Sequence, residues 1–80
     1  MTPNRKKVIN TNKDAELRAI EFEALVNEAQ IICIEVQGMK YENEERKVLG
    51  QSMAYVEDSF LIMAEKLRKV TENMRNLARL

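Results

Sequence analysis

The feature that most constrains the fold is a regular apolar repeat in the second half of the chain. Nine apolar residues recur there at alternating steps of four and three: Leu49, Met53, Val56, Phe60, Met63, Leu67, Val70, Met74 and Leu77. This spacing places all nine on one stripe of an α-helix, as in the heptads of a coiled coil. The sequence therefore predicts one long helix over residues 44–80, with acids in its first turn and arginines in its last, as the helix dipole favours.

A shorter helix is predicted before it, over residues 11–37. Its apolar stripe consists of Phe22, Leu25, Ala29, Ile32 and Val36. Thr11 and Asp14 have the spacing of a capping box, which predicts that the helix begins at residue 11. Gly38 is placed to end it.

Together the two helices predict an all-α domain over residues 1–80. The connection, residues 38–43, is short enough to require an antiparallel helical hairpin, in which residue 13 lies near residue 68. Residues 1–10 form a basic N-terminal arm. Because the second helix is the longer one, its last turns are expected to extend beyond the first helix.

Each helix also has a second apolar face, which a hairpin cannot bury. Its residues are Leu17, Ile20, Ala24, Ile31, Ile34, Tyr55, Leu61 and Ile62. A chain of 80 residues is marginally stable alone, and its single cysteine, Cys33, cannot form an internal disulfide. These facts predict a homo-oligomeric helical bundle, and the cysteine usage suggests a reducing, cytoplasmic location. The alternative is that these aliphatic side chains are scattered over the surface and form no interface.

The sequence lacks the residues of common catalytic sites. It contains no histidine, so nucleophilic designs that pair Cys or Ser with His are excluded. The acids are expected on solvated faces, which predicts neither a metal site nor a cofactor. The longest apolar run, residues 31–34, is too short to cross a bilayer. We expect a protein that is not an enzyme and does not associate with membranes.

Positive charge is concentrated at the two ends of the sequence, although 13 basic and 13 acidic residues balance overall. An antiparallel hairpin would bring these ends together, placing Lys13 and Arg18 near Lys66 and Arg68. Free amide groups at a helix N-terminus beside Lys13 would favour an anion. A small phosphorylated ligand held between subunits fits best, because a nucleic-acid polymer would require a larger basic surface with aromatic residues. The alternative is that Lys13 is simply solvated.

The stretch I-N-T-N-K-D-A-E-L-R at residues 9–18 resembles the start of the first long helix in the phage anti-CBASS sponge family. Proteins of this family are small helical hairpins that sequester cyclic oligonucleotide signals. Residues 49–63, L-G-Q-S-M-A-Y-V-E-D-S-F-L-I-M, are similar to the closing helix of the family, with its Glu-x-Ser-bulky pattern. The two stretches cover about a third of the chain.

The resemblance implies a homo-hexamer that encloses cyclic dinucleotides or trinucleotides between subunits. It also implies that Lys13 contacts the ligand, whereas Lys66 and Arg68 are candidates by position. The candidate ligand-binding residues are therefore Asn10, Thr11, Lys13, Arg18, Lys66 and Arg68. The family has a base-stacking aromatic residue upstream of its lysine, but nothing aromatic precedes Phe22 here. Base stacking therefore does not carry over from the family: either the ligand class differs, or the pocket uses Tyr41 or Tyr55 of another subunit.

The expected function is sequestration without turnover, which would block a CBASS-type antiphage defence in an infected bacterium. The alternative is a small coiled-coil interaction protein that inhibits or scaffolds a host or phage protein.

Overall fold

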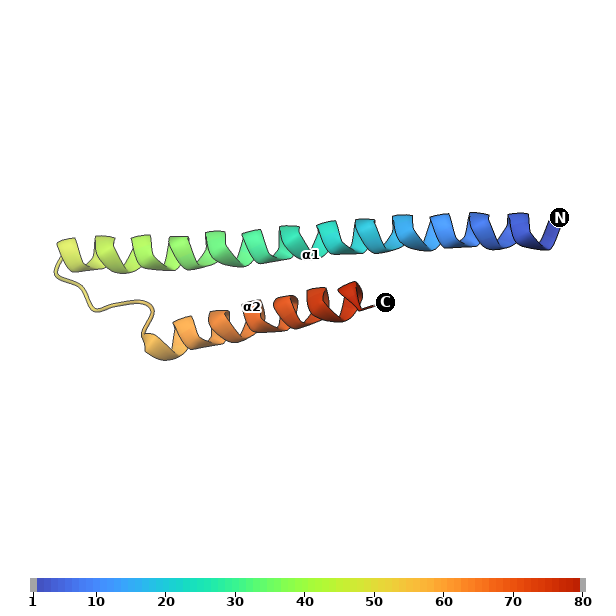
Figure 1. Ribbon diagram of the computed structural model, residues 1–80. Helices are drawn as coiled ribbons and strands as arrows, with labels where there is room; N and C mark the ends of the chain where they lie inside the picture. The colour runs from blue at the N-terminus through green and yellow to red at the C-terminus, as the bar shows by residue number, and fades with distance from the viewer. Residues whose placement is uncertain (1, 80) are drawn as a thin grey trace.

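Two antiparallel helices make up the described part of the chain. The computed structural model describes the backbone of residues 2–79 and the side chains of residues 13–79. Helix α1 spans Thr2–Val48, and helix α2 spans Glu57–Ala78. Residues 49–56 connect them, and α2 runs back along α1 (Figure 1). This confirms the all-α class and the helical hairpin.

The predicted helix boundaries are wrong, because Gly38 does not end the first helix. Gly38 lies inside α1, and among the described residues only Gly50 has a positive φ, of 72°. A glycine inside a helix costs only about 1 kcal/mol relative to alanine. The residues after Gly38 are mostly good helix formers, and Arg46 forms an ion pair with Glu42 one turn earlier, at 2.9 Å. Residues 38–43 are therefore helical instead of forming the connection.

Helix α1 ends at a Schellman motif built around Gly50. The amide of Gly50 donates to the carbonyl of Lys47 at 3.1 Å, and the amide of Gln51 donates to that of Arg46 at 2.7 Å. This pair of bonds needs a left-handed residue at the first position after the cap, where glycine carries no steric cost.

Helix α2 begins thirteen residues later than the predicted residue 44. Val56 is the extended N-cap residue and forms no side-chain cap bond, while Glu57 and Asp58 supply the acids that the first turn favours. Leu49, Met53 and Val56, which the heptad pattern included, lie in the connection and are more than half exposed.

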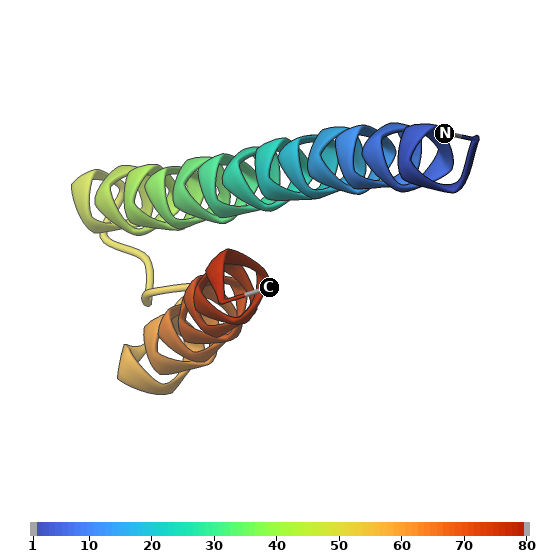
Figure 2. The same cartoon turned by 45° about the vertical axis from the view of Figure 1, so that its right-hand side comes forward.

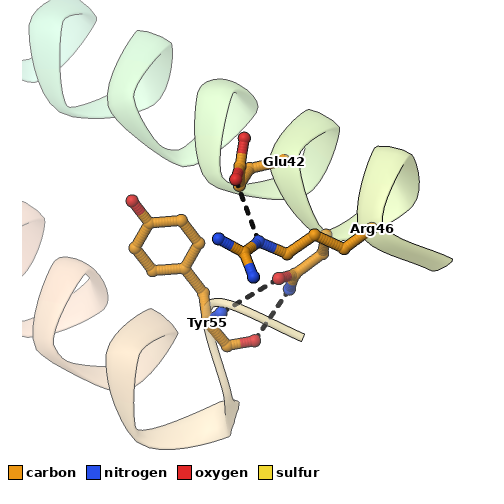
Figure 3. A network of polar contacts seen from close by, with 4 residues as sticks. Glu42, Arg46 and Tyr55 are labelled. Atoms are coloured by element: carbon orange, nitrogen blue, oxygen red, sulfur yellow. Dashed lines mark hydrogen bonds and ion pairs between the residues drawn. The ribbon is translucent and has the colours of Figure 1, made fainter. Parts of the chain in front are cut away.

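Asn43 attaches the connection to α1 through two hydrogen bonds to Tyr55, drawn as dashed lines to Tyr55 in Figure 3. Its side-chain amide donates to the carbonyl of Tyr55 at 2.7 Å, and its side-chain oxygen accepts the amide hydrogen of Tyr55 at 2.9 Å. The side-chain amide of Asn43 thus bonds to both the N–H and the C=O of Tyr55, as a backbone partner does in an antiparallel β-sheet, and Tyr55 is held beside Asn43. They also set the register of the hairpin, because α2 begins only two residues later.

The two helices pack along the apolar stripes that the sequence predicted, except that Phe22 is 44 % exposed and lies outside the core cluster. Leu25, Ile32 and Met39 from α1 are buried against Met63 and Val70 from α2. Around them pack further apolar residues: Ala29, Val36, Tyr55, Phe60, Leu67, Met74 and Leu77. No described residue is less than 3 % exposed, and Val70 reaches that value. The seam is therefore narrow, as expected for only two helices.

The overhanging helix is α1, which contradicts the sequence prediction. Val70 shares a groove with Ile32, so continuing the register places the end of α2 beside the α1 turn that contains Phe22. The turns of α1 before Phe22 extend beyond α2 (Figures 1 and 2). The resulting molecule measures 74 × 17 × 10 Å. Residue 13 consequently does not lie near residue 68.

Candidate anion-binding groove

A basic concave surface lies along α2 from Ala64 to the C-terminal end of the helix. It is an open groove of about 770 Å³, lined by α2 and its C-cap residue Arg79. The lining residues are Ala64, Leu67, Arg68, Thr71, Glu72, Arg75, Asn76 and Arg79. They recur at helical spacing, so they form one flank of α2 beside the seam with α1. We call this surface the arginine groove.

The arginine groove carries a net positive charge. Its three guanidinium groups and the carboxylate of Glu72 give a balance of +3 − 1 = +2. Arg68 forms an ion pair with Glu65 one turn earlier, and both side chains are more than half exposed. Water and salt weaken such a pair, so the guanidinium of Arg68 can turn toward a ligand at little cost. Guanidinium groups bind phosphate through two parallel hydrogen bonds, so the groove suits a phosphorylated ligand.

Two neutral side chains complete the polar lining of the arginine groove. Thr71 donates its hydroxyl hydrogen to the carbonyl of Leu67 at 3.1 Å, which leaves its oxygen as an acceptor. The amide of Asn76 offers both donors and an acceptor. These groups add neutral hydrogen-bond donors and acceptors beside the guanidinium groups.

Lys66 lies on the other flank of α2, away from the arginine groove. It lines a separate groove with Lys69 and with Glu28 and Glu35 of α1. These acids offset the lysine charges, so Lys66 and Arg68 do not form one basic cluster as predicted. Of the two α2 candidates, only Arg68 lies in the arginine groove.

The candidates on α1 lie apart from both α2 candidates. Lys13 is exposed and Arg18 is half-buried, and both precede the turn opposite the end of α2. The helix begins at Thr2, so Thr11 is inside it and the predicted capping box is wrong. Lys13 consequently has no free helix N-terminus beside it. The side chains of Asn10 and Thr11 are outside the described part, and their roles stay predictions.

Sequence reasoning did not place Thr71, Arg75, Asn76 or Arg79 among the candidate ligand-binding residues. The available signal was that Arg75 and Arg79 follow Arg68 by seven and eleven residues, which places all three on one face of a helix. The prediction instead grouped basic residues by their nearness to the ends of the sequence, which combined Lys66 and Arg68 although they lie on different flanks of α2.

Neither described helix is long and apolar enough to cross a membrane. Within the described side chains, no group of three or more His, Cys, Asp or Glu residues could hold a metal ion.

A scan against protein-family models and searches of curated proteins and of solved structures gave no match. The family likeness therefore rests on the residues quoted above.

Proposed function

We propose that this protein is a non-catalytic sponge that sequesters a cyclic oligonucleotide immune signal. The observation that carries the proposal is the arginine groove, whose balance of two positive charges matches the two phosphates of a cyclic dinucleotide. The resemblance of residues 9–18 and 49–63 to the anti-CBASS sponge family supports the choice of ligand. The protein would act in the cytoplasm of an infected bacterium and deprive a CBASS-type defence of its activating signal.

The proposal includes self-association, with a hexamer as the resemblance implies. The groove is lined by a single helix, so one chain covers only one side of a ligand. Another chain would have to close the other side for a ligand to be enclosed. Lys13 and Arg18 lie on the overhang of α1, where the chain's own α2 does not cover them. They are therefore available to a ligand bound by a neighbouring chain.

Intact-mass measurement of the assembly, with and without a panel of cyclic dinucleotides and trinucleotides, tests the proposal. We expect an oligomer that takes up stoichiometric ligand and releases it chemically unchanged after denaturation. A dimer or monomer that takes up none of the panel would refute it. A hydrolysed or otherwise altered ligand would refute the absence of turnover.

Charge-reversal variants then locate the site. Arg75→Glu changes the groove balance from +2 to 0, so we expect it to abolish the rise in melting temperature that the ligand causes. Lys13→Glu tests the lysine that the resemblance selects. Lys47→Glu, an equal charge change at the other end of the hairpin, is the matched control. Binding that survives both Arg75→Glu and Lys13→Glu would show that the site lies elsewhere.

One observation favours the second candidate function, a coiled-coil interaction protein. Leu17, Ile20, Ile31 and Ile34 form an apolar face of α1 that α2 does not cover, and each is more than half exposed. Such a face suits a helical partner. A chain that binds no nucleotide but retains a stable complex with a host or phage protein would favour this function over the sponge.

A further inference from the structure

A second groove adjoins the arginine groove. It has a volume of about 380 Å³ and is lined by both helices. Its apolar lining consists of Ile32, Val36, Phe60, Met63, Ala64 and Leu67, and its polar lining of Cys33, Gln37 and Lys40. We call this surface the apolar groove. Because Ala64 and Leu67 line both grooves, the two form one continuous surface.

We infer that the apolar groove holds the purine base of a nucleotide whose phosphate lies in the arginine groove. The inference rests on the proposed function for the phosphate, and it adds the class of base that the same site selects. Three features of the joined grooves carry it: the order of residues along α2, the aromatic ring of Phe60, and a polar pair on α1.

The chemical character of α2 changes across the junction of the grooves. Arg68 lines the arginine groove, and Phe60 lines the apolar groove. The eight residues between their positions span about 12 Å of helix. Ala64 and Leu67 lie between them and carry no charge. A ligand that crosses this junction therefore needs an anionic end and a flat or apolar end, and a nucleotide has both.

Phe60 supplies an aromatic surface at the required place. The chain has four aromatic residues, and of these only Phe60 lines either of the joined grooves. Its side chain packs against the core cluster but is only half-buried, so the ring is held in place while part of it stays accessible. Stacking on an aromatic ring is favourable for every nucleobase. Phe60 can therefore stack on the base without Tyr41 or Tyr55 of another subunit.

Gln37 and Lys40 select a purine among the bases. They are exposed and lie three residues apart on one face of α1, at the rim of the apolar groove. Both purines present the acceptor N7 beside a 6-substituent, which is an amino donor in adenine and an oxygen acceptor in guanine. Lys40 can only donate, which suits N7, whereas the amide of Gln37 suits either 6-substituent. An alkyl chain offers neither group a hydrogen bond.

Ala64 keeps the passage between the grooves open. Its side chain is small and exposed at the junction, so a larger residue there would separate the grooves without entering the core. Leucine has nearly the helix propensity of alanine. Ala64→Leu is therefore expected to fold normally while blocking a ligand that spans both grooves.

Calorimetric titration of the full chain tests the inference. The probes are AMP, ribose 5-phosphate, cyclic di-AMP, cyclic di-UMP and octyl phosphate. We expect AMP to bind about tenfold more tightly than ribose 5-phosphate, which lacks the base, and cyclic di-AMP at least about fivefold more tightly than cyclic di-UMP. Ala64→Leu and Gln37→Ala should remove these preferences and leave ribose 5-phosphate binding unchanged. Gln30→Ala, exposed on α1 and outside both grooves, is the matched control.

Alkylation of Cys33 gives a second, local readout. Cys33 is the single cysteine of the chain, is exposed, and lines the apolar groove. A base bound in the apolar groove should slow its reaction with iodoacetamide. We expect saturating AMP to protect Cys33 and saturating ribose 5-phosphate not to protect it.

Several results would overturn the inference. These are a purine preference that survives both Ala64→Leu and Gln37→Ala, equal alkylation of Cys33 with and without AMP, and octyl phosphate binding as tightly as AMP. Equal binding of cyclic di-AMP and cyclic di-UMP would remove this inference and leave the sponge in place. Binding of AMP that depends on Ala64, without uptake of any cyclic dinucleotide, would sustain this inference while removing the sponge. If no probe binds, both fall.

Discussion

Replacing Asn43 with alanine should destabilise the hairpin although it improves the helix. The variant removes the bonds of 2.7 and 2.9 Å between the Asn43 side chain and the backbone of Tyr55. Each bond contributes about 0.5–1.5 kcal/mol, so about 1–3 kcal/mol is lost. Alanine regains about 0.5 kcal/mol of helix propensity. The net loss of about 0.5–2.5 kcal/mol corresponds to a fall in melting temperature of very roughly 2–20 °C for a domain of this size.

Thermal melting followed by circular dichroism, at one fixed protein concentration, measures this effect. Glu44→Ala, on the same turn but exposed, is the matched control and should leave the melting temperature nearly unchanged. Amide exchange adds a local measure, because the amide hydrogen of Tyr55 should exchange faster in Asn43→Ala. A variant that melts at or above the wild-type temperature, with the Tyr55 amide equally protected, would refute the view that Asn43 sets the register.

The two glycines should respond in opposite directions to alanine. Gly50→Ala should destabilise the protein by about 1 kcal/mol in urea denaturation, because φ is 72° there, whereas Gly38→Ala should stabilise it by up to about 1 kcal/mol. Equal effects of the two substitutions would contradict the helix end described here. Val70→Ala should cost about 2 kcal/mol by the same assay, since Val70 is 3 % exposed, and Val48→Ala, at 78 % exposed, should cost little. A similar loss in both valine variants would mean that α2 does not pack along this seam.

The packing stripes could be predicted from the sequence, but the positions of the helix ends could not. Apolar spacing depends only on helical periodicity, so residues 60–77 and 25–36 were assigned to the seam correctly. A glycine, by contrast, can either end a helix or continue it at modest cost, and Gly38 and Gly50 differ in backbone conformation, not in type. The choice of Gly38 displaced the connection by about three turns of helix.

The displaced connection also explains why the predicted site residues on the two helices do not lie together. In an antiparallel pair, moving the connection by a given number of residues shifts the residue opposite any fixed position by twice that number. Arg68 therefore does not lie opposite Lys13 as predicted. The position of Arg68 on a helix face did not depend on the register, and it is the α2 candidate that lies in the arginine groove. Predictions based on one helix were therefore more robust than predictions based on two.

The unequal lengths of α1 and α2 divide the molecule into regions of different stability. Residues 25–39 pack against side chains from α2, whereas residues 13–21 contribute no side chain to the described core cluster and lie beyond the end of α2. Helical order in that stretch depends on propagation from the supported part and on whatever a second molecule contributes. In the proposed assembly the stretch couples backbone order to association, so its helical content is expected to increase with protein concentration. Part of the binding free energy would then be used to order the overhang, so its sequence could tune the affinity of assembly without any change in the contacts.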